Sequence, residues 1–324
     1  MFNKKTLRDI DVSGKRALVR VDFNVPLSKD RKVVDDTRIK SSLPTIRYLL
    51  DKGARVIIIS HLGRPGGKFD PEVTLDPVAD ALSGLLGRKV RKVDKTVSHE
   101  VEREVEKMKA GDILVLENIR FNPAEKENDE EFAKKLATLG DIFINDAFGT
   151  SHREHASTVG VTKFLPAVSG FLMEKEIETL SKLLESPKKP FYVVLGGNKC
   201  SDKIRVIENF INVVEGILIG GGMCFTFLKA LGYEIGRSIC QDDFVDKVKM
   251  IMKKAELKKV KMLLPVDVVV AREIDENSEY KIVEVKDIPS DWIGVDIGPK
   301  TIQVFQEELE KAKTIFWNGP MGVF

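Results

Sequence analysis

The sequence predicts an α/β protein with parallel β-sheets, and two observations support this fold class. Short apolar runs rich in β-branched residues alternate with helix-like segments along the whole chain. These runs are apolar on both faces, which is typical of strands in a parallel sheet that helices cover on both sides. With 324 residues, the chain is long enough for two domains, each with its own core.

The first half of the chain predicts four strands separated by helices. The strands are expected at residues 16–23, 54–60, 112–118 and 141–146. Between them, Asp36 is placed to cap a helix that Gly53 ends. Asn128, followed three residues later by Glu131, has the spacing of a capping box before another helix. This alternation of strand and helix indicates a parallel sheet.

The second half repeats the alternation, with strands expected at residues 191–197, 215–222, 261–270 and 314–320. Ser201 is a candidate N-cap, which would place Lys203 in the first turn of the next helix. Between the two series of strands lies an amphipathic helix pattern that ends in a basic, proline-flanked loop. We therefore expect an N-terminal domain at 1–170, a connecting helix and linker at 171–190, and a C-terminal domain at 191–324.

Composition and charge argue against several classes of protein. Hydrophobic residues make up 43% of the chain and charged residues 31%, as in soluble globular proteins. Because the formal net charge is only +2, neither nucleic acid nor an anionic membrane is expected as a partner. The first residues are polar and unlike a signal peptide, and the three cysteines form no CxxC pair. We therefore expect reduced thiols and a cytoplasmic location.

Polar and mostly cationic side chains follow the strands of the first half, at the edge where parallel sheets bind ligands. These residues are Asp22, Asn24, His61, Arg64, Arg120 and Arg153, with Arg38 in the first turn of a nearby helix. The planar fork of arginine binds carboxylate and phosphate oxygens. The sequence therefore predicts a site for a small ligand with more than one anionic group.

Each of these features also has a simpler explanation. A single arginine is more often part of a surface ion pair, and only the shared place of these arginines after strand ends favours a binding site. His152 and His155 suggest metal ligands, but no third ligand is near them in the sequence, so we expect no metal held by the protein. Arg20, inside a strand, is expected to be a buried ion-pair partner rather than a ligand contact.

Bare glycines follow the strands of the second half, in the stretches "LGGNKCSDK", "IGGGMCF" and "WNGPMG". Glycine lets a flat ring or a phosphate chain approach the backbone closely, although glycines after strands often only make tight turns. Lys199 and Lys203 lie in the first stretch and are candidates to contact a phosphate. The chain has neither a P-loop nor a complete dinucleotide-binding fingerprint. One cationic and one glycine-rich edge together fit phosphoryl transfer.

The motifs "RVDFNVPL", "SHLGRP", "LENIRFNPAEKEND", "NDAFGTSHREHAS", "VLGGNKCSDKI", "LIGGGMCFTFLKALG", "DIGPKTI" and "WNGPMGVF" occur in the order typical of the phosphoglycerate kinase family. The chain resembles this family from end to end. The resemblance implies an α/β fold of two Rossmann-like domains with parallel sheets, facing each other across a hinged cleft. It also implies reversible, in-line phosphoryl transfer between 1,3-bisphosphoglycerate with ADP and 3-phosphoglycerate with ATP, without a covalent intermediate. Mg²⁺ would be carried by the nucleotide, and the protein would be a monomer.

The resemblance also assigns roles to residues. Those implied to bind the phosphoglycerate are Asp22, Asn24, Arg38, His61, Arg64, Arg120 and Arg153. Those implied to bind the nucleotide are Gly197, Asn198, Lys199, Lys203, Gly221, Gly222, Gly294 and Asn318. Arg38 and Lys203 are the implied catalytic residues, since both would contact the phosphoryl group in flight.

Two departures from the family pattern stand out. Position 198 is Asn where the family usually has Ala beside the adenine, and this larger polar side chain would narrow the pocket or add a hydrogen bond. The chain also ends at "WNGPMGVF", where family members continue, so we expect a C-terminally truncated sequence with an incomplete nucleotide domain. The alternatives are a truncated, catalytically impaired phosphoglycerate-binding module and an unrelated enzyme of sugar-acid phosphates on a similar scaffold.

Overall fold

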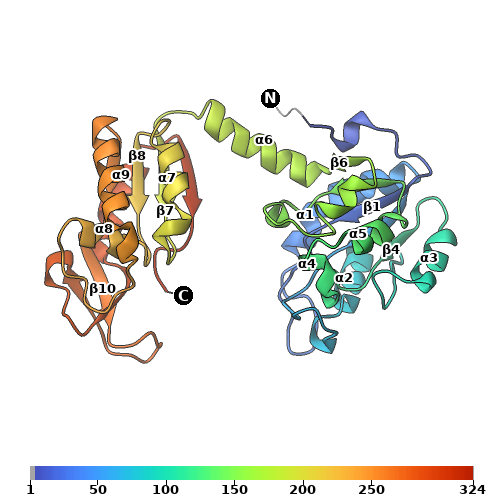
Figure 1. The fold of residues 1–324 in the computed structure, drawn as a ribbon, viewed down its shortest axis with the longest axis horizontal. Helices are drawn as coiled ribbons and strands as arrows, with labels where there is room; N and C mark the ends of the chain where they lie inside the picture. Colours follow the sequence, from blue (N-terminus) through green and yellow to red (C-terminus); the bar gives the residue numbers. More distant parts are fainter. Residues whose placement is uncertain (1–3, 324) are drawn as a thin grey trace. The chain divides into compact units, whose positions relative to one another are not determined.

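The computed structural model describes residues 4–323, apart from the side chain of Leu184. The chain divides into two compact units, Met1–Ser181 and Lys182–Phe324, called unit 1 and unit 2 below. The expected domain bounds at residues 1 and 324 lie outside the described residues. Figure 1 labels the elements of both units, and each unit is described here by itself.

Unit 1 contains a six-stranded sheet in the order β3-β4-β2-β1-β5-β6. Every neighbouring pair of these strands is parallel, as the sequence predicted. The strands are β1 (Arg16–Arg20), β2 (Arg55–Ile59), β3 (Arg91–Lys92), β4 (Ile113–Val115), β5 (Ile142–Asn145) and β6 (Ala167–Ser169). Since all the strands run the same way, the loops that follow them reach one edge of the sheet.

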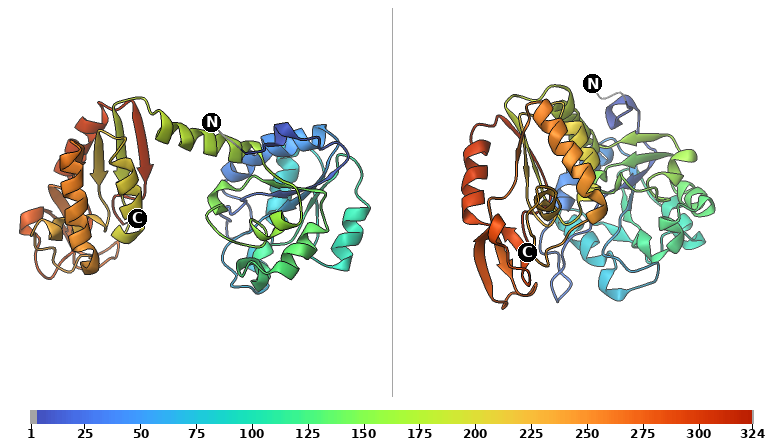
Figure 2. Two further views of the ribbon diagram at one scale, coloured as in Figure 1. Left: turned by 45° about the horizontal axis from the view of Figure 1, so that its top comes forward. Right: turned by 60° about the vertical axis from the view of Figure 1, so that its left-hand side comes forward.

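The helices of unit 1 cover both faces of this sheet (Figure 2). They are α1 (Thr37–Asp51), α2 (Asp76–Leu86), α3 (His99–Glu106), α4 (Pro123–Lys126), α5 (Glu130–Ala137) and the first part of α6 (Phe171–Glu185). Successive side chains of β1 point to opposite faces, so Val19 packs in one apolar cluster with α1 and α2, and Leu18 packs in another with α3 and α5. The 3-10 helices are η1 (Leu7–Asp9), η2 (Pro71–Val73), η3 (Ile119–Phe121), η4 (Phe148–Thr150) and η5 (Gly160–Lys163).

Unit 2 contains a four-stranded parallel sheet in the order β13-β7-β8-β9. Its strands are β7 (Phe191–Leu195), β8 (Gly216–Ile219), β9 (Lys261–Leu263) and β13 (Thr314–Asn318). The helices are α7 (Ile204–Phe210), α8 (Cys224–Ala230), α9 (Val245–Leu257) and α10 (Pro299–Leu309), with 3-10 helices η6 (Cys200–Asp202), η7 (Asp242–Phe244) and η8 (Val285–Asp287). Val193 of β7 packs in the cluster that holds α7, α8 and α9, whereas Val194 packs on the other face with α10.

The prediction of one strand over residues 261–270 was wrong. This stretch forms two strands, β9 in the parallel sheet and β10 (Asp267–Ala271) in a separate sheet. Pro265 lies between them, and proline cannot donate a hydrogen bond within a sheet. The second sheet is antiparallel, in the order β11-β10-β12, with β11 (Tyr280–Glu284) and β12 (Ile293–Ile297).

Two predicted helix caps also differ in the structure. The N-cap of α5 is Asp129, whose side chain accepts a hydrogen bond from Phe132 N at 2.7 Å, and not Asn128. Asn128 instead takes a left-handed conformation with φ of 53° just before this cap. Ser201 lies inside η6, and α7 begins only at Ile204 without a side-chain cap. A residue that favours a cap therefore indicates the region of a helix start, and its neighbours decide the position.

Candidate active site

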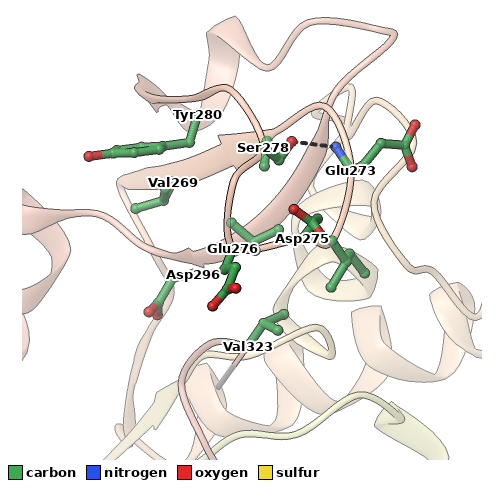
Figure 3. A pocket seen from close by; sticks show the side chains of 11 residues that line it. Val269, Glu273, Asp275, Glu276, Ser278, Tyr280, Asp296 and Val323 are labelled. Atoms are coloured by element: carbon green, nitrogen blue, oxygen red, sulfur yellow. Dashed lines mark hydrogen bonds between the residues drawn. The ribbon is translucent and has the colours of Figure 1, made fainter.

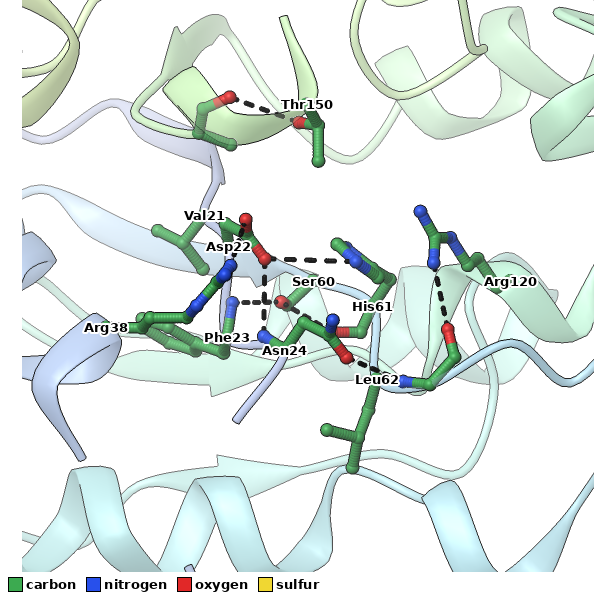
Figure 4. A network of polar contacts seen from close by, with 12 residues as sticks. Val21, Asp22, Phe23, Asn24, Arg38, Ser60, His61, Leu62, Arg120 and Thr150 are labelled. Atoms are coloured by element: carbon green, nitrogen blue, oxygen red, sulfur yellow. Dashed lines mark hydrogen bonds and ion pairs between the residues drawn. The ribbon is translucent and has the colours of Figure 1, made fainter. Parts of the chain in front are cut away.

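The strands of unit 1 bring most of the predicted anion-binding residues to one edge. Asp22 follows β1, His61 follows β2, Arg120 lies in η3 after β4, and Arg153 follows η4 after β5. Figure 4 shows Asp22, Arg38 and His61 pointing toward one another, with Arg120 on the far side of His61. This set, called the arginine edge below, comprises Asp22, Asn24, Arg38, His61, Arg120 and Arg153.

Asp22 is the polar centre of the arginine edge. Its Oδ2 accepts a hydrogen bond from Arg38 Nη1 at 2.5 Å, and its Oδ1 lies 3.8 Å from His61 Nε2. The backbone N–H of Asn24 also donates to Oδ1, at 3.3 Å. The Arg38 side chain is 52% exposed, so it is free to exchange this carboxylate for a ligand oxygen.

The loop that carries Arg64 is held through the peptide of Gly63. Asn24 Oδ1 accepts from Gly63 N at 2.8 Å, and Arg120 Nη1 donates to Gly63 O at 2.8 Å. Gly63 has φ of +63°, and a Cβ there would lie 2.9 Å from Val73 Cγ1, so this position needs glycine. Arg64 itself is exposed, and no hydrogen bond or ion pair joins its side chain to another described residue.

The arginine edge carries an excess of positive charge around a buried histidine. His61 is only 3% exposed. Burial lowers its pKa to about 2, and the positive charges of nearby arginines add to this effect, namely Arg20, Arg120, Arg153 and Arg38. Burial, followed by the charges of Arg153 and Arg20, likewise lowers the pKa of Arg120. The imidazole is therefore neutral at physiological pH, and the arginines supply the positive charge.

One donor of this edge is unused. Arg120 is 4% exposed, and its buried Nε has no hydrogen-bond partner among the described residues. An unpaired buried donor beside other arginines is unfavourable until an acceptor binds. The donor set suits an anion, because guanidinium groups can only donate hydrogen bonds.

Sequence reasoning missed the layer beneath this edge. Arg20 was expected to form a buried ion pair, and it is 1% exposed. Its Nε donates to Ser157 Oγ at 2.9 Å and its Nη2 contacts His61 Nδ1 at 3.2 Å, so hydrogen bonds replace a direct ion pair. Glu125 lies behind Ser157 and is fully buried. The signal of this layer in the sequence was Arg20, a charged residue at the end of the apolar run of β1.

The two histidines considered as metal ligands contact different residues. His155 Nδ1 is 3.5 Å from Glu125 Oε1, whereas His152 is exposed and accepts from Arg153 Nε at 3.2 Å. Within residues 4–323, no group of three histidine, cysteine or acidic side chains is placed to hold a metal ion. No helix in the described part of the chain has the length and apolar character needed to span a membrane.

Unit 2 brings the predicted nucleotide-binding glycines to one cavity of about 340 Å³. This glycine cavity is lined by Gly197, Asn198, Gly221, Gly222, Gly294, Pro320 and Gly322, together with Arg237 and the apolar residues Ile239, Ile274, Ile293, Val295 and Val323. A Cβ on Gly221 would lie 2.6 Å from Gly197 N, and one on Gly294 would lie 1.9 Å from Phe225 Cζ. Glycine is therefore required at both positions, because a side chain there would overlap neighbouring atoms.

Three other residues predicted to bind the nucleotide do not line this cavity: Lys199, Lys203 and Asn318. They are close in the sequence to residues that do. Lys203 Nζ donates to Asn318 Oδ1, which joins the end of η6 to the last residue of β13. Ser201 is held by Gln241, whose Oε1 accepts from Ser201 N at 2.9 Å. Lys199 is exposed. Lys203 and Asn318 thus form a polar pair outside the lining of the glycine cavity.

A second cavity in unit 2, of about 570 Å³, was not predicted (Figure 3). Its lining is acidic, with Glu273, Asp275, Glu276 and Asp296, and it shares Ile274, Val295 and Val323 with the glycine cavity. Four carboxylates repel phosphate and carboxylate groups, so the acidic cavity is unsuited to an anionic ligand.

Comparison with known proteins gives a consistent result. Residues 7–324 match the family described as phosphoglycerate kinase. The chain is 58% identical over 324 residues to a phosphoglycerate kinase of Dictyoglomus turgidum, covering 99% of this chain and 81% of that protein. It is 54% identical to one of Pseudothermotoga lettingae, with coverage of 100% and 82%.

Solved structures agree with these matches. The phosphoglycerate kinase of Coxiella burnetii superimposes with a TM-score of 0.80 at 40% identity, covering 99% of this chain and 81% of that one. The phosphoglycerate kinase of Pyrococcus horikoshii gives a TM-score of 0.79 at 33% identity, with coverage of 99% and 82%. The family match, the identities and the shared two-unit α/β fold together show that the chain belongs to the phosphoglycerate kinase family.

Proposed function

We propose that unit 1 binds the phosphoglycerate at the arginine edge and that unit 2 binds the nucleotide at the glycine cavity. As a member of its family, the chain is a kinase that transfers a phosphoryl group reversibly between 1,3-bisphosphoglycerate with ADP and 3-phosphoglycerate with ATP, a step of glycolysis. In this proposal, residues 1–170 form the acid-binding domain, 171–190 the connection and 191–324 the nucleotide-binding domain.

The observation that carries the acid site is the convergence of several arginine charges on one neutral histidine. 3-Phosphoglycerate has a phosphate at one end and a carboxylate at the other, so it supplies two anionic groups. Arg120 and Arg153 lie close enough for each charge to lower the pKa of the buried imidazole, and the unused Nε of Arg120 offers a further donor. Asn24, His61 and Arg64 complete the proposed site, with Asp22 orienting Arg38 until the ligand binds.

Arg38 has the proposed role of stabilising charge on the phosphoryl group during transfer. It is the more exposed partner of its ion pair, and its fork matches phosphate oxygens. The acceptor carboxylate is already ionised and is a competent nucleophile, so no general base is required and His61 is proposed only to donate a hydrogen bond. Transfer is then direct and in line, and positioning and charge neutralisation supply most of the rate enhancement.

The glycine cavity is proposed to hold the adenine and ribose. A flat ring is proposed to lie against the backbone at Gly197, Gly221 and Gly222, which line the cavity without side chains, and Asn198 lines the same space. Lys203 is proposed to contact the nucleotide phosphates and the transferring group, with Asn318 and Lys199 beside it. Mg²⁺ is proposed as the cofactor, carried by ATP or ADP, because magnesium in such sites is bound mainly by phosphates and water. It would neutralise charge on the β- and γ-phosphate oxygens.

The alternative of a phosphoglycerate-binding module without catalysis is not favoured, because the family match includes both units. We propose that the protein is a monomer. We also propose a cytoplasmic location, because the three cysteines are free thiols among the described residues.

Titration calorimetry tests the proposal with 3-phosphoglycerate and Mg-ADP in separate experiments, and a coupled assay measures turnover. We expect the acid to bind with an affinity that falls as salt is added, because the contacts are ionic. Arg120→Gln is expected to lower the affinity for 3-phosphoglycerate and to leave the affinity for Mg-ADP unchanged. An equal loss of affinity for both ligands in this variant would contradict the assignment of the arginine edge to the acid. So would an affinity for 3-phosphoglycerate that does not depend on the arginines.

A further inference from the structure

A continuous chain of contacts leads from the buried interior of unit 1 to Arg38. It begins at Glu125 in α4, passes through the loop after η4 and the strand β1, and ends at the exposed tip of the Arg38 side chain. We call it the buried relay, and its members in order are Glu125, Ser157, Arg20, His61, Asp22 and Arg38.

The direction of each hydrogen bond in the first half of the relay is fixed by chemistry. The Ser157 hydroxyl accepts from Arg20 Nε at 2.9 Å, because a guanidinium has only donors. Its single proton is then free to be donated to Glu125 Oε1, which lies 2.6 Å away. Glu125 Oε2 accepts from Ser157 N at 2.9 Å, so the carboxylate binds both donors of one residue.

The same argument fixes the tautomer of His61. Arg20 Nη2 lies 3.2 Å from His61 Nδ1 and can only donate to it, so Nδ1 carries no proton. The single proton of the neutral ring is therefore on Nε2, and this N–H faces Asp22 Oδ1 at 3.8 Å. The other oxygen of Asp22 accepts from Arg38.

We propose that Glu125 and Ser157 are positioning residues, which lock Arg20 and thereby fix the His61 tautomer and the orientation of Asp22 and Arg38. The inference rests on the role that the proposed function gives to Arg38. Neither residue reaches the exposed edge, so neither is expected to touch a substrate: Glu125 and Ser157 are both fully buried.

Glu125 is suited to this role because it is charged in the interior. Burial alone would raise its pKa, but contact with His155, the charge of Arg20 and the two bonds from Ser157 lower the pKa overall. The charge of Arg20, buried in β1, is thus compensated through Ser157 without a direct ion pair. Glu125 O also accepts from Ala156 N at 2.9 Å, which ties α4 to the loop that presents Arg153.

The main test is Ser157→Ala, with Ser42→Ala as the matched control. Both serines are buried in unit 1, at 0% and 1% exposure, but Ser42 lies on α1 outside the relay. ¹⁵N spectra of the imidazoles report the tautomer directly, and the chain has only four histidines to assign. We expect one Nε2–H tautomer for His61 in the parent and in Ser42→Ala, and a mixture of tautomers in Ser157→Ala.

Kinetics provide the second readout. In Ser157→Ala, kcat should fall by up to about a hundredfold, the effect of displacing a catalytic group by roughly 1 Å. KM for the acid should change much less, because the arginines that bind it remain. Glu125→Asp, which keeps the charge, should retain more kcat than Glu125→Gln, which places an amide N–H against a donor of Ser157.

The possible results separate the inference from the proposed function. An unchanged His61 spectrum in Ser157→Ala overturns the inference, whatever the activity of the enzyme. A changed spectrum with an unchanged kcat also overturns it, because the relay would then not reach Arg38. If Arg38→Ala itself keeps full kcat, the proposed role of Arg38 fails, and the spectra alone then show whether Ser157 still fixes the tautomer of His61.

Discussion

The two parallel sheets of this kinase place different kinds of residue at the ends of their strands. In unit 1, long charged side chains converge there, and a second layer of polar residues is buried beneath them. In unit 2, glycines follow β7 and β8 and help to line a cavity whose other lining side chains are mainly apolar, apart from Asn198 and Arg237. One edge is made specific by charge and the other by the absence of side chains.

The difference teaches how each edge can fail. A buried charge is unfavourable unless a hydrogen bond or an opposite charge compensates it. The arginine edge therefore depends on buried residues that do not contact a ligand. The glycine cavity has little tolerance for added volume at Gly221 and Gly294, because a Cβ at either position would overlap neighbouring atoms. Mutations should therefore act through electrostatics in unit 1 and through sterics in unit 2.

The largest effect is expected in unit 1, at the arginine edge. Arg38→Ala should lower kcat by about 10³-fold, equivalent to roughly 4 kcal/mol, because it removes a donor to charge that develops during transfer. Affinity for 3-phosphoglycerate should fall far less, since the other arginines remain. Steady-state kinetics and calorimetry measure the two quantities, and an equal loss of both would assign Arg38 to ground-state binding instead.

The steric side of the comparison is tested by Gly221→Ala. A Cβ there would lie 2.6 Å from Gly197 N, so we expect Mg-ADP to bind more weakly by about 1–3 kcal/mol, with the affinity of the acid unchanged. Gly232→Ala is a matched control in unit 2, because Gly232 also has a positive φ but no atom within 4 Å of its Cβ position. If both variants bind Mg-ADP equally well, the clash at Gly221 does not limit nucleotide affinity.

The pH dependence of stability gives a smaller effect per pH unit, specific to unit 1. The pKa of His61 is about 2 in the folded protein, below the unfolded value of about 6.5. As pH falls below about 6.5, the unfolded chain gains this proton first, so the free energy of unfolding decreases by up to about 1.4 kcal/mol per pH unit. His61→Gln keeps an acceptor for Arg20 and should remove this contribution, which urea titrations at a series of pH values measure. Parallel curves for parent and variant would show that His61 has the same pKa in the folded and unfolded states.

The sequence predicted these two edges better than it predicted what lies beneath them. Residues after strands could be placed together because parallel strands end at one edge, and Asp22, His61 and Arg120 lie where that rule put them. The relay could not be predicted, since Arg20 and Ser157 are 137 residues apart and meet only through the packing of the whole unit. The antiparallel sheet around β10 was missed for a similar reason: pairing partners are not visible in an apolar run, although Pro265 marked its interruption.

The smallest effect is expected at Asn198, the position that departs from the family pattern. Its side chain is exposed at the rim of the glycine cavity, so it adds a little volume and polarity without filling the space. Asn198→Ala should therefore change Mg-ADP affinity by no more than about 0.5 kcal/mol, the usual range for surface substitutions. Calorimetry on the parent and the variant decides the point, and the acid titration serves as the internal control. A loss of tenfold or more, about 1.4 kcal/mol, would mean that a side-chain contact and not open space determines nucleotide affinity, and the contrast between the two edges would weaken accordingly.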